Sequence, residues 1–136
     1  MTRTLNEDDL KLMGLFEKRT GAVLKDCIKT GEIIAFIVLQ GLEKAIGPGG
    51  KNIKSLEKAM NKRIRVIQWD EDKDQFIKNT FSPYQISNII EKDGKITLEA
   101  SDYKTRGMLI GRNASTLRTN ETIIRRYFPI GELRVA

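Results

Sequence analysis

The spacing of apolar residues in the first half of the chain predicts six elements of secondary structure. Leu10, Met13 and Phe16 recur at helical spacing after Asn6, a residue type that often caps helices, and they predict a helix. Apolar runs of strand length, helical spacing and turn residues predict the other five. These are strands at 22–28 and 32–39, helices at 41–46 and 51–61, and a strand at 63–69.

The second half of the chain repeats this order. Its predicted elements are a helix at 72–80, strands at 84–90 and 95–100, helices at 103–110 and 115–127, and a strand at 131–135. Both halves therefore follow the order α-β-β-α-α-β. We predict an α+β fold in which each half packs a three-stranded sheet on its helices.

Glycines at turns and breaks indicate that the two halves are a duplication. Gly31 and Gly94, in the two predicted hairpin turns, are 63 residues apart. Gly47 and Gly111, in the breaks between helices, are 64 residues apart, and each follows an isoleucine. Glycine at a turn has a backbone reason that apolar residues lack, so this agreement favours a repeated domain.

The duplication divides the chain into two predicted domains, residues 1–70 and 71–136. Domains of this size are marginally stable alone, so docking against each other would stabilise both. The joint at 70–74 is charged and contains no Gly, Ser or Pro, and we therefore expect a fixed mutual orientation.

Composition narrows the class of protein. Of the 136 residues, 40% are apolar and 31% are charged, which is ordinary for a folded globular chain. No apolar run approaches the roughly 18 residues of a membrane span, and the N-terminal sequence lacks the apolar segment of a signal peptide, so we expect a cytoplasmic protein. The net charge of +6 favours a polyanionic partner, but it also fits an ordinary solvated surface.

Residues needed for common catalytic and metal sites are missing. The chain has no histidine, which excludes histidine-based triads and histidine-containing zinc sites. Its single cysteine, Cys27, lies in an alternating run typical of a core strand. No cluster of catalytic carboxylates or activated nucleophile is found, and we expect neither enzymatic activity nor a cofactor.

Acidic residues at the joint have the alternate spacing of a calcium-binding loop. Asp70, Asp72 and Asp74 match the first positions of an EF-hand, but Gln75 stands where glycine is required and Phe81 where a bidentate glutamate is required. An acidic helix start is favoured instead, because negative charge stabilises a helix N-terminus. We predict no metal site.

The break at 47–50 reads Gly-Pro-Gly-Gly and opens a helix. A Walker A loop would need glycine at Ala45 and Ser or Thr at Asn52, and a dinucleotide fingerprint would need its third glycine at Asn52. Three glycines leave the backbone unshielded, and unpaired amides at a helix N-terminus attract phosphate. The loop is therefore either a phosphate site or a corner between two helices.

The helix after this loop is predicted to have two contrasting faces. At 100° per residue, Ile53, Leu56 and Met60 fall on one face, which would pack against the core. Four lysines fall on the opposite face: Lys51, Lys54, Lys58 and Lys62. This face would meet anions or would simply be solvated.

The stretch AIGPGGKNI resembles the signature of the KH family of RNA-binding domains. In that family a GXXG loop stands between two helices, follows Ile-Gly and precedes an apolar residue. The order α-β-β-α-α-β is similar to the type II KH arrangement, and two type II copies without a spacer resemble the archaeal NusA type of transcription factor.

The resemblance implies binding of single-stranded RNA, with about four nucleotides per groove and the phosphates on the GXXG loop. A floor of Ile46, Ile53 and the strand at 33–39 would meet the bases. In the first domain the implied RNA contacts are Gly47, Pro48, Gly49, Gly50, Lys51, Lys54 and Lys58. RNA polymerase or a transcription complex is the implied protein partner of a monomeric factor for transcription termination or antitermination.

The second domain departs from the KH pattern. Its stretch LIGRNASTL keeps Ile110, Gly111 and Leu117, but Ala114 replaces the fourth glycine and places a methyl group where a phosphate would pass. Charge and hydrogen bonds from neighbouring residues would compensate. The candidate RNA contacts are Gly111, Arg112, Asn113 and Arg118. A structural relic is the alternative for this copy. For the chain as a whole, the alternative function is a KH-fold module that docks a protein, or that associates with ribosomes or RNA processing, without a direct role in termination.

Overall fold

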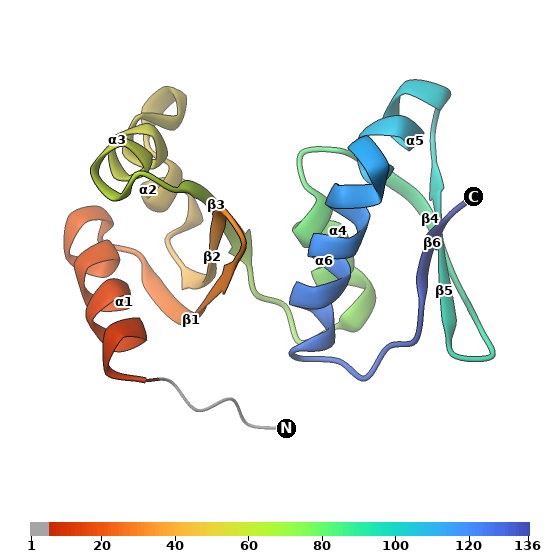
Figure 1. Ribbon diagram of the computed structural model, residues 1–136, viewed down its shortest axis with the longest axis horizontal. Coiled ribbons are helices and arrows are strands. Elements are labelled where there is room, and N and C mark those ends of the chain that lie inside the picture. Colours follow the sequence, from red (N-terminus) through yellow and green to blue (C-terminus); the bar gives the residue numbers. More distant parts are fainter. Residues whose placement is uncertain (1–5) are drawn as a thin grey trace. The chain divides into compact units, whose positions relative to one another are not determined.

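The computed structural model describes residues 6–136, which form two compact units that divide between Trp69 and Asp70. Each unit has its own three-stranded sheet (Figure 1). The first five residues, assigned above to the first domain, lie outside the described residues. No helix within residues 6–136 has both the length and the apolar character needed to cross a membrane.

The elements of the first unit follow the predicted order. They are α1 (Glu7–Thr20), β1 (Val23–Thr30), β2 (Ile33–Gln40), α2 (Leu42–Ile46), the short 3-10 turn η1 (Pro48–Gly50), α3 (Lys51–Met60) and β3 (Arg63–Gln68). The predicted α+β class is confirmed.

The sheet of the first unit has the strand order β1-β2-β3. β1 and β2 form an antiparallel hairpin, in which Thr30 pairs with Ile33. β3 runs parallel to β2, from the pair Ile33 and Arg63 to the pair Val38 and Gln68. A parallel pair needs a crossover connection, and α2 and α3 supply it.

Helices α1, α2 and α3 lie on one side of this sheet, and the core fills the space between (Figure 1). Phe16 of α1 stacks on Phe36 of β2 with 4.1 Å between the ring centroids, and both side chains are fully buried. Cys27 is buried in the same core, as predicted. Further members are Met13, Ala22, Leu24, Ile34, Val38, Ala45, Leu56 and Ile64.

Both ends of α1 are capped. The side-chain oxygen of Asn6 accepts the backbone N–H of Asp9 at 2.7 Å, which confirms the predicted N-cap. At the other end Gly21, with φ 79°, donates its N–H to the carbonyl of Glu17 at 2.8 Å.

The second unit has the same order and pairing of elements. Its elements are α4 (Lys73–Phe81), β4 (Ile86–Lys92), β5 (Lys95–Ala100), α5 (Tyr103–Ile110), the 3-10 turn η2 (Arg112–Ala114), α6 (Ser115–Arg125) and β6 (Leu133–Val135). The sheet order is β4-β5-β6, with an antiparallel hairpin followed by a parallel third strand.

Helices α4 and α6 lie side by side on one side of the second sheet (Figure 1). Phe76 of α4 meets Tyr127 edge to face, with 5.6 Å between the ring centroids. Ile96 and Leu98 of β5 and Leu109 of α5 are fully buried. Each unit therefore has a core built from the same kinds of elements.

The units also share a side-chain contact in their first helices. Thr20 donates its hydroxyl to the carbonyl of Phe16 at 2.8 Å, and Thr80 donates its hydroxyl to the carbonyl of Phe76 at the same distance. Both phenylalanines are fully buried. This shared detail, together with the repeated order of elements, supports a duplication.

The two hairpin turns are less alike than the sequence indicates. Gly31 and Glu32 are the central residues of the first turn, and only Gly31 has a positive φ, 56°. In the second turn Asp93 and Gly94 are central, and both have positive φ, as a type I′ turn requires. Gly31 and Gly94 therefore occupy different turn positions, and their use as an equivalent pair is wrong.

Some element ends also differ from the prediction. β4 begins at Ile86 rather than at residue 84, because a turn follows α4. In this turn the N–H of Tyr84 donates to the carbonyl of Phe81 at 3.1 Å. α6 ends at Arg125 rather than at residue 127, because the last turn tightens, with the N–H of Arg126 donating to the carbonyl of Ile123 at 3.2 Å and the N–H of Tyr127 to that of Ile124 at 3.0 Å.

Candidate nucleic-acid interface

The first loop joins α2 to α3 and turns on three glycines with positive φ. The angles are 75° at Gly47, 60° at Gly49 and 76° at Gly50. A Cβ atom on Gly47 would lie 2.8 Å from the side chain of Asn52, so the turn needs glycine there for space as well as conformation. A Cβ atom on Gly49 would meet nothing within 4 Å. The loop thus has a tight base and an open tip.

Hydrogen bonds inside the loop use some of the backbone groups that could hold a phosphate. Gly50 donates its N–H to the carbonyl of Gly47 at 3.0 Å, and Lys51 donates its N–H to the carbonyl of Pro48. The prediction that the amides entering α3 are unpaired is therefore wrong for these two residues, because the 3-10 turn pairs them. Anion attraction is left to the open tip, the helix dipole and nearby cations.

Asn52 is a residue of this loop whose role the sequence analysis missed. Its side-chain amide donates to the carbonyl of Lys44 at 2.7 Å, which ties the end of α2 to the start of α3. The only sequence signal is an amide residue two positions after a Gly-Gly pair, which is too common to identify a clamp.

The predicted two faces of α3 are confirmed. Leu56 is buried, and Ile53 and Met60 pack against the core. The opposite face is exposed and carries Lys51, Lys54 and Lys58. Lys62 is also exposed, but it lies beyond the end of α3 at Met60, after Asn61 in the left-handed conformation, so its predicted place on this helix face is wrong. Within the described part of the chain none of these four lysines forms an ion pair, so their charge is available to an anion.

The predicted groove floor is only partly accessible. Strand residues from Ile34 to Val38 are buried, which leaves them little surface for a base. Ile46 and Ile53 are partly buried and lie on either side of the loop. Any contact with a base would therefore fall mainly on these two side chains and on Leu39, which is 42% exposed at the end of the predicted floor strand.

The second loop has nearly the same backbone as the first, although its sequence differs. Gly111 has φ 75° and ψ 176°, against 75° and 166° at Gly47. Asn113 has φ 54° and ψ 34°, close to 60° and 22° at Gly49. Ala114 keeps the angles of the glycine that it replaces, and its N–H donates to the carbonyl of Gly111 at 3.3 Å.

The segment after the second loop has less positive charge than the equivalent segment after the first loop. The residues 64 positions after Lys51, Lys54, Lys58 and Lys62 are Ser115, Arg118, Thr122 and Arg126. Two of the four positions are therefore neutral. Arg112 and Asn113 are exposed at the tip of the loop, as predicted for compensating contacts.

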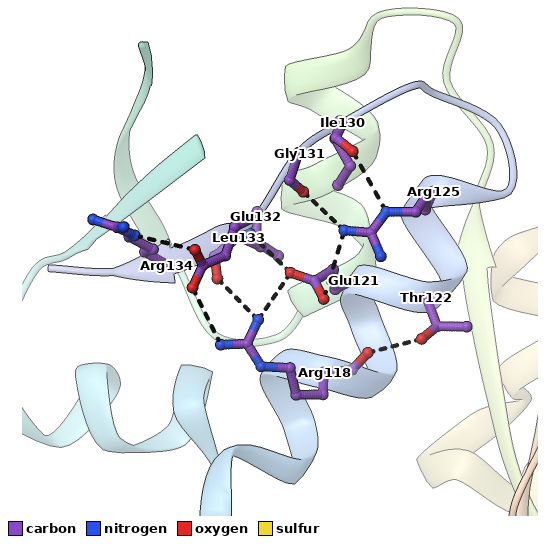
Figure 2. A network of polar contacts seen from close by, with 9 residues as sticks. All are labelled: Arg118, Glu121, Thr122, Arg125, Ile130, Gly131, Glu132, Leu133 and Arg134. Carbon is purple, nitrogen blue, oxygen red and sulfur yellow. Dashed lines mark hydrogen bonds and ion pairs between the residues drawn. The ribbon is translucent and has the colours of Figure 1, made fainter. Parts of the chain in front are cut away.

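Arg118 belongs to a network that fixes β6 to α6 (Figure 2). Its guanidinium lies 2.9 Å from the carboxylate of Glu121 and 3.9 Å from that of Glu132. Glu121, which is buried, accepts the backbone N–H of Leu133 at 2.8 Å and is also 3.7 Å from Arg125. Arg118 is thus a structural residue, with 49% of its side chain still exposed.

The acidic residues at the joint serve the start of α4. Asp72 accepts the N–H of Gln75 at 2.9 Å as the N-cap, and Asp70 accepts the N–H of Asp72 at 2.8 Å. In residues 6–136 no three potential ligands among Cys, Asp and Glu gather in a way that could hold a metal ion.

No known family model matches the chain. Over 135 residues it is 30% identical to the probable transcription termination protein NusA of Methanocaldococcus jannaschii, covering 96% of this chain and 74% of that relative. The chain belongs to the NusA family. A NusA relative from Halococcus morrhuae is 28% identical over 139 residues and matches over the full length of both chains. A NusA relative from Methanococcus vannielii is 41% identical over 86 residues, which are 62% of this chain and 50% of that one.

The fold of this NusA-family chain is also similar to a solved structure, the crystal structure of APE1850. The TM-score is 0.79 at 25% sequence identity, covering 97% of this chain and 100% of that one.

Proposed function

We propose that this NusA-family chain binds single-stranded RNA through two tandem type II KH domains, residues 1–70 and 71–136. The observation that carries the proposal is that the two loops share the same positive-φ backbone conformation and lie at equivalent points of the repeated fold. The names of the relatives support a role in transcription termination, and we propose termination or antitermination as the process in which the chain acts. We further propose a monomeric, cytoplasmic, non-catalytic factor with RNA polymerase or a transcription complex as its protein partner.

In the first domain the RNA backbone would pass over the open tip at Pro48 and Gly49. Gly47 and Gly50 hold the turn that presents this tip. The exposed Lys51, Lys54 and Lys58 would pair with successive phosphates, while Ile46 and Ile53 would meet the bases.

In the second domain the same groove would hold RNA more weakly. The contacts proposed there are Gly111, Arg112, Asn113 and the outward side of Arg118. Fewer free cations line this groove, because the guanidinium of Arg118 is paired with Glu121 and two of the four positions equivalent to the lysines of the first domain are neutral. We propose unequal grooves, with the first dominating affinity.

The decisive test replaces Pro48 and Gly49 together with aspartate. Both residues are exposed, and aspartate tolerates positive φ better than most residues, so thermal stability should change little. Affinity for an unstructured 12-nucleotide RNA, measured by fluorescence anisotropy, should fall at least tenfold, about 1.4 kcal/mol. If the double variant stays folded and binds RNA like the parent, the loop is only a corner between two helices and the proposal is wrong.

The matched control places aspartate at Arg112 and Asn113 in the second loop. This pair removes more positive charge than the first, yet we expect a smaller loss of RNA affinity because the second groove is the weaker one. A larger loss than in the first variant would reverse the proposed ranking of the two grooves.

Docking of a protein is the second candidate function, favoured by the paired Arg118 and by Ala114 in the second loop. Capture of RNA polymerase from a cell extract separates the two functions. Under RNA binding, the aspartate variants lose RNA and keep polymerase. Under docking, they lose polymerase while RNA affinity stays at the level of the parent.

A further inference from the structure

α5 begins with an aromatic ring that lies in water. Tyr103 is 86% exposed, more than any other large hydrophobic side chain in the described residues. A single exposed ring needs no explanation by itself, since folded proteins leave such residues on their surfaces. Its neighbours on the same helix face, however, indicate a binding surface.

Gly107, one turn further along α5, is not required by the fold. It lies inside the helix without a positive φ, and a Cβ atom there would meet nothing within 4 Å. Alanine would fit this position and would favour the helix, because glycine loses more backbone entropy on folding. A glycine that the chain does not need for itself leaves room for the close approach of something else.

Tyr103 and Gly107 lie on a line that leads to the second loop. At 100° per residue, Tyr103, Gly107 and Gly111 fall within about 80° on the exposed side of α5, opposite the buried Leu109. At about 1.5 Å per residue, this line is about 12 Å long. Lys104 is exposed beside it, and Arg112 is exposed at its far end.

We propose that RNA held at the second loop continues along the outer face of α5, passes over Gly107 and stacks one base on the ring of Tyr103. The inference rests on the proposed RNA-binding function and goes beyond its loop contacts. Exposed aromatic rings beside positive charge are how proteins bind single strands with little sequence preference. Continuity with the loop and the charges of Lys104 and Arg112 favour a nucleic acid over a peptide at this face.

This face would supply the second domain with a contact that its loop lacks. The first domain offers free lysines to phosphates, whereas the second has lost two of the four cationic positions. A base stacked on Tyr103 replaces part of that attraction with a contact that salt screens little. The two domains would then hold one strand by different chemistry.

The first experiment compares Tyr103→Ala with Tyr103→Phe, using anisotropy with an unstructured 12-nucleotide RNA. Tyr103→Ala should weaken binding about fivefold or more, and Tyr103→Phe should stay within about twofold, because stacking needs the ring and not the hydroxyl. The control is Tyr84→Ala, which removes another exposed tyrosine of the same unit, outside α5. Equal binding by Tyr103→Ala and the parent would overturn the inference.

The second experiment tests whether a substitution at Gly107 changes stability and RNA affinity in opposite directions. Gly107→Ala should raise the melting temperature of the second unit and at the same time lower RNA affinity, a combination that a purely structural role would not produce. Gly14→Ala is the control, because Gly14 is an exposed helical glycine on α1 with nothing within 4 Å of its Cβ position. It should raise stability and leave RNA binding unchanged. Unchanged RNA affinity in Gly107→Ala would count against the path over α5.

These outcomes separate this inference from the proposed function. If the Pro48 and Gly49 variant loses RNA while Tyr103→Ala and Gly107→Ala bind normally, only the α5 path is wrong. If the parent does not bind RNA, the proposed function fails and the path fails with it. If Tyr103→Ala loses RNA polymerase but keeps RNA, the face docks a protein and the inference is overturned.

Discussion

Ala114 adopts a backbone conformation that alanine disfavours. Its φ of 59° and ψ of 21° match the 76° and 17° of Gly50, its counterpart in the first loop. For a residue with a Cβ atom, this left-handed region costs about 1–2 kcal/mol. The second loop keeps the shape of the first despite this cost, so the surrounding fold imposes the conformation.

The strain at Ala114 should be measurable. Ala114→Gly should raise the free energy of unfolding of the second unit by about 0.5–1 kcal/mol, the relieved strain less the extra entropy of glycine in the unfolded chain. The converse change, Gly50→Ala, should destabilise the first unit by a similar amount, because alanine would be strained at this positive φ. No steric clash should add to the cost, since the nearest atom to a Cβ there belongs to Lys54 at 4.0 Å. Urea denaturation of both variants measures the two effects. A stable Gly50→Ala variant would contradict the strain.

Single residues were predictable where one rule governs them locally. The cap at Asn6 and the lysine face of α3 follow from spacing alone, and both are found. The left-handed Asn113 was not predictable, because its conformation is set by the fold around the loop. Arg118 was predicted only as a candidate for RNA contact, and its partner Glu132 lies 14 positions away across a turn.

At the scale of elements, a glutamate on the third helix of each unit holds the start of the last strand. Glu57 accepts the N–H of Ile64 at 3.0 Å, and Glu121 accepts the N–H of Leu133 at 2.8 Å. In both units the carboxylate accepts a hydrogen bond from a backbone amide near the start of the parallel third strand. The two anchors differ in burial, since Glu121 is buried and Glu57 is only partly so.

Removing the buried anchor should loosen β6. Glu121→Ala should lower the free energy of unfolding by about 2 kcal/mol, because it leaves the amide of Leu133 unpaired and deprives Arg118 of its nearest carboxylate. The matched variant Glu57→Ala should cost about 1 kcal/mol, since water can reach the amide that it uncovers. Thermal and urea unfolding measure both. A larger effect from Glu57→Ala would show that burial does not set the cost.

The order of elements was predictable because helix and strand periods differ and recur in both halves. Element ends were less so. The hairpin turns were misaligned because a glycine serves equally well as the first residue of one turn type or the second of another. The end of α6 depended on a tightening of its last turn that periodicity does not detect.

For the whole molecule, the two proposed grooves should make RNA binding depend on length and salt. An RNA of about eight to twelve nucleotides should bind much better than one of four, because a second KH contact becomes intramolecular. Isothermal titration with both lengths tests this. Equal affinity for the two would mean that only one domain binds.

Salt dependence tests the phosphate contacts of the first domain. Log affinity should fall linearly with log salt, with a shallower slope than duplex DNA gives, and Lys54→Gln should reduce the slope by about 0.7 if that lysine neutralises one phosphate of a single strand. Lys11→Gln on α1 is the control, because this exposed lysine lies 3.3 Å from Glu7. An unchanged slope for Lys54→Gln would remove it from the interface.

The whole-molecule prediction rested on the repeat, and its strongest pair, Gly47 and Gly111, does occupy equivalent turns. The α+β class followed from alternating elements without knowledge of any contact. Which domain presents more positive charge on the helix after its loop also followed from the sequence, through the lysines of α3. The network around Arg118 could not follow, since it joins groups from a helix and the segment that enters β6.

The parallel pairing of β3 with β2 sets an order on how the first unit can form during synthesis. β1 and β2 are neighbours in sequence and can pair as soon as both have left the ribosome, whereas β3 must wait for the intervening helices. Trp69 follows β3, donates its N–H to the carbonyl of Val38 at 2.8 Å and lies 4.6 Å from the ammonium group of Lys25. As the only tryptophan of the chain, it gives a fluorescence signal for the moment at which the nascent first sheet closes.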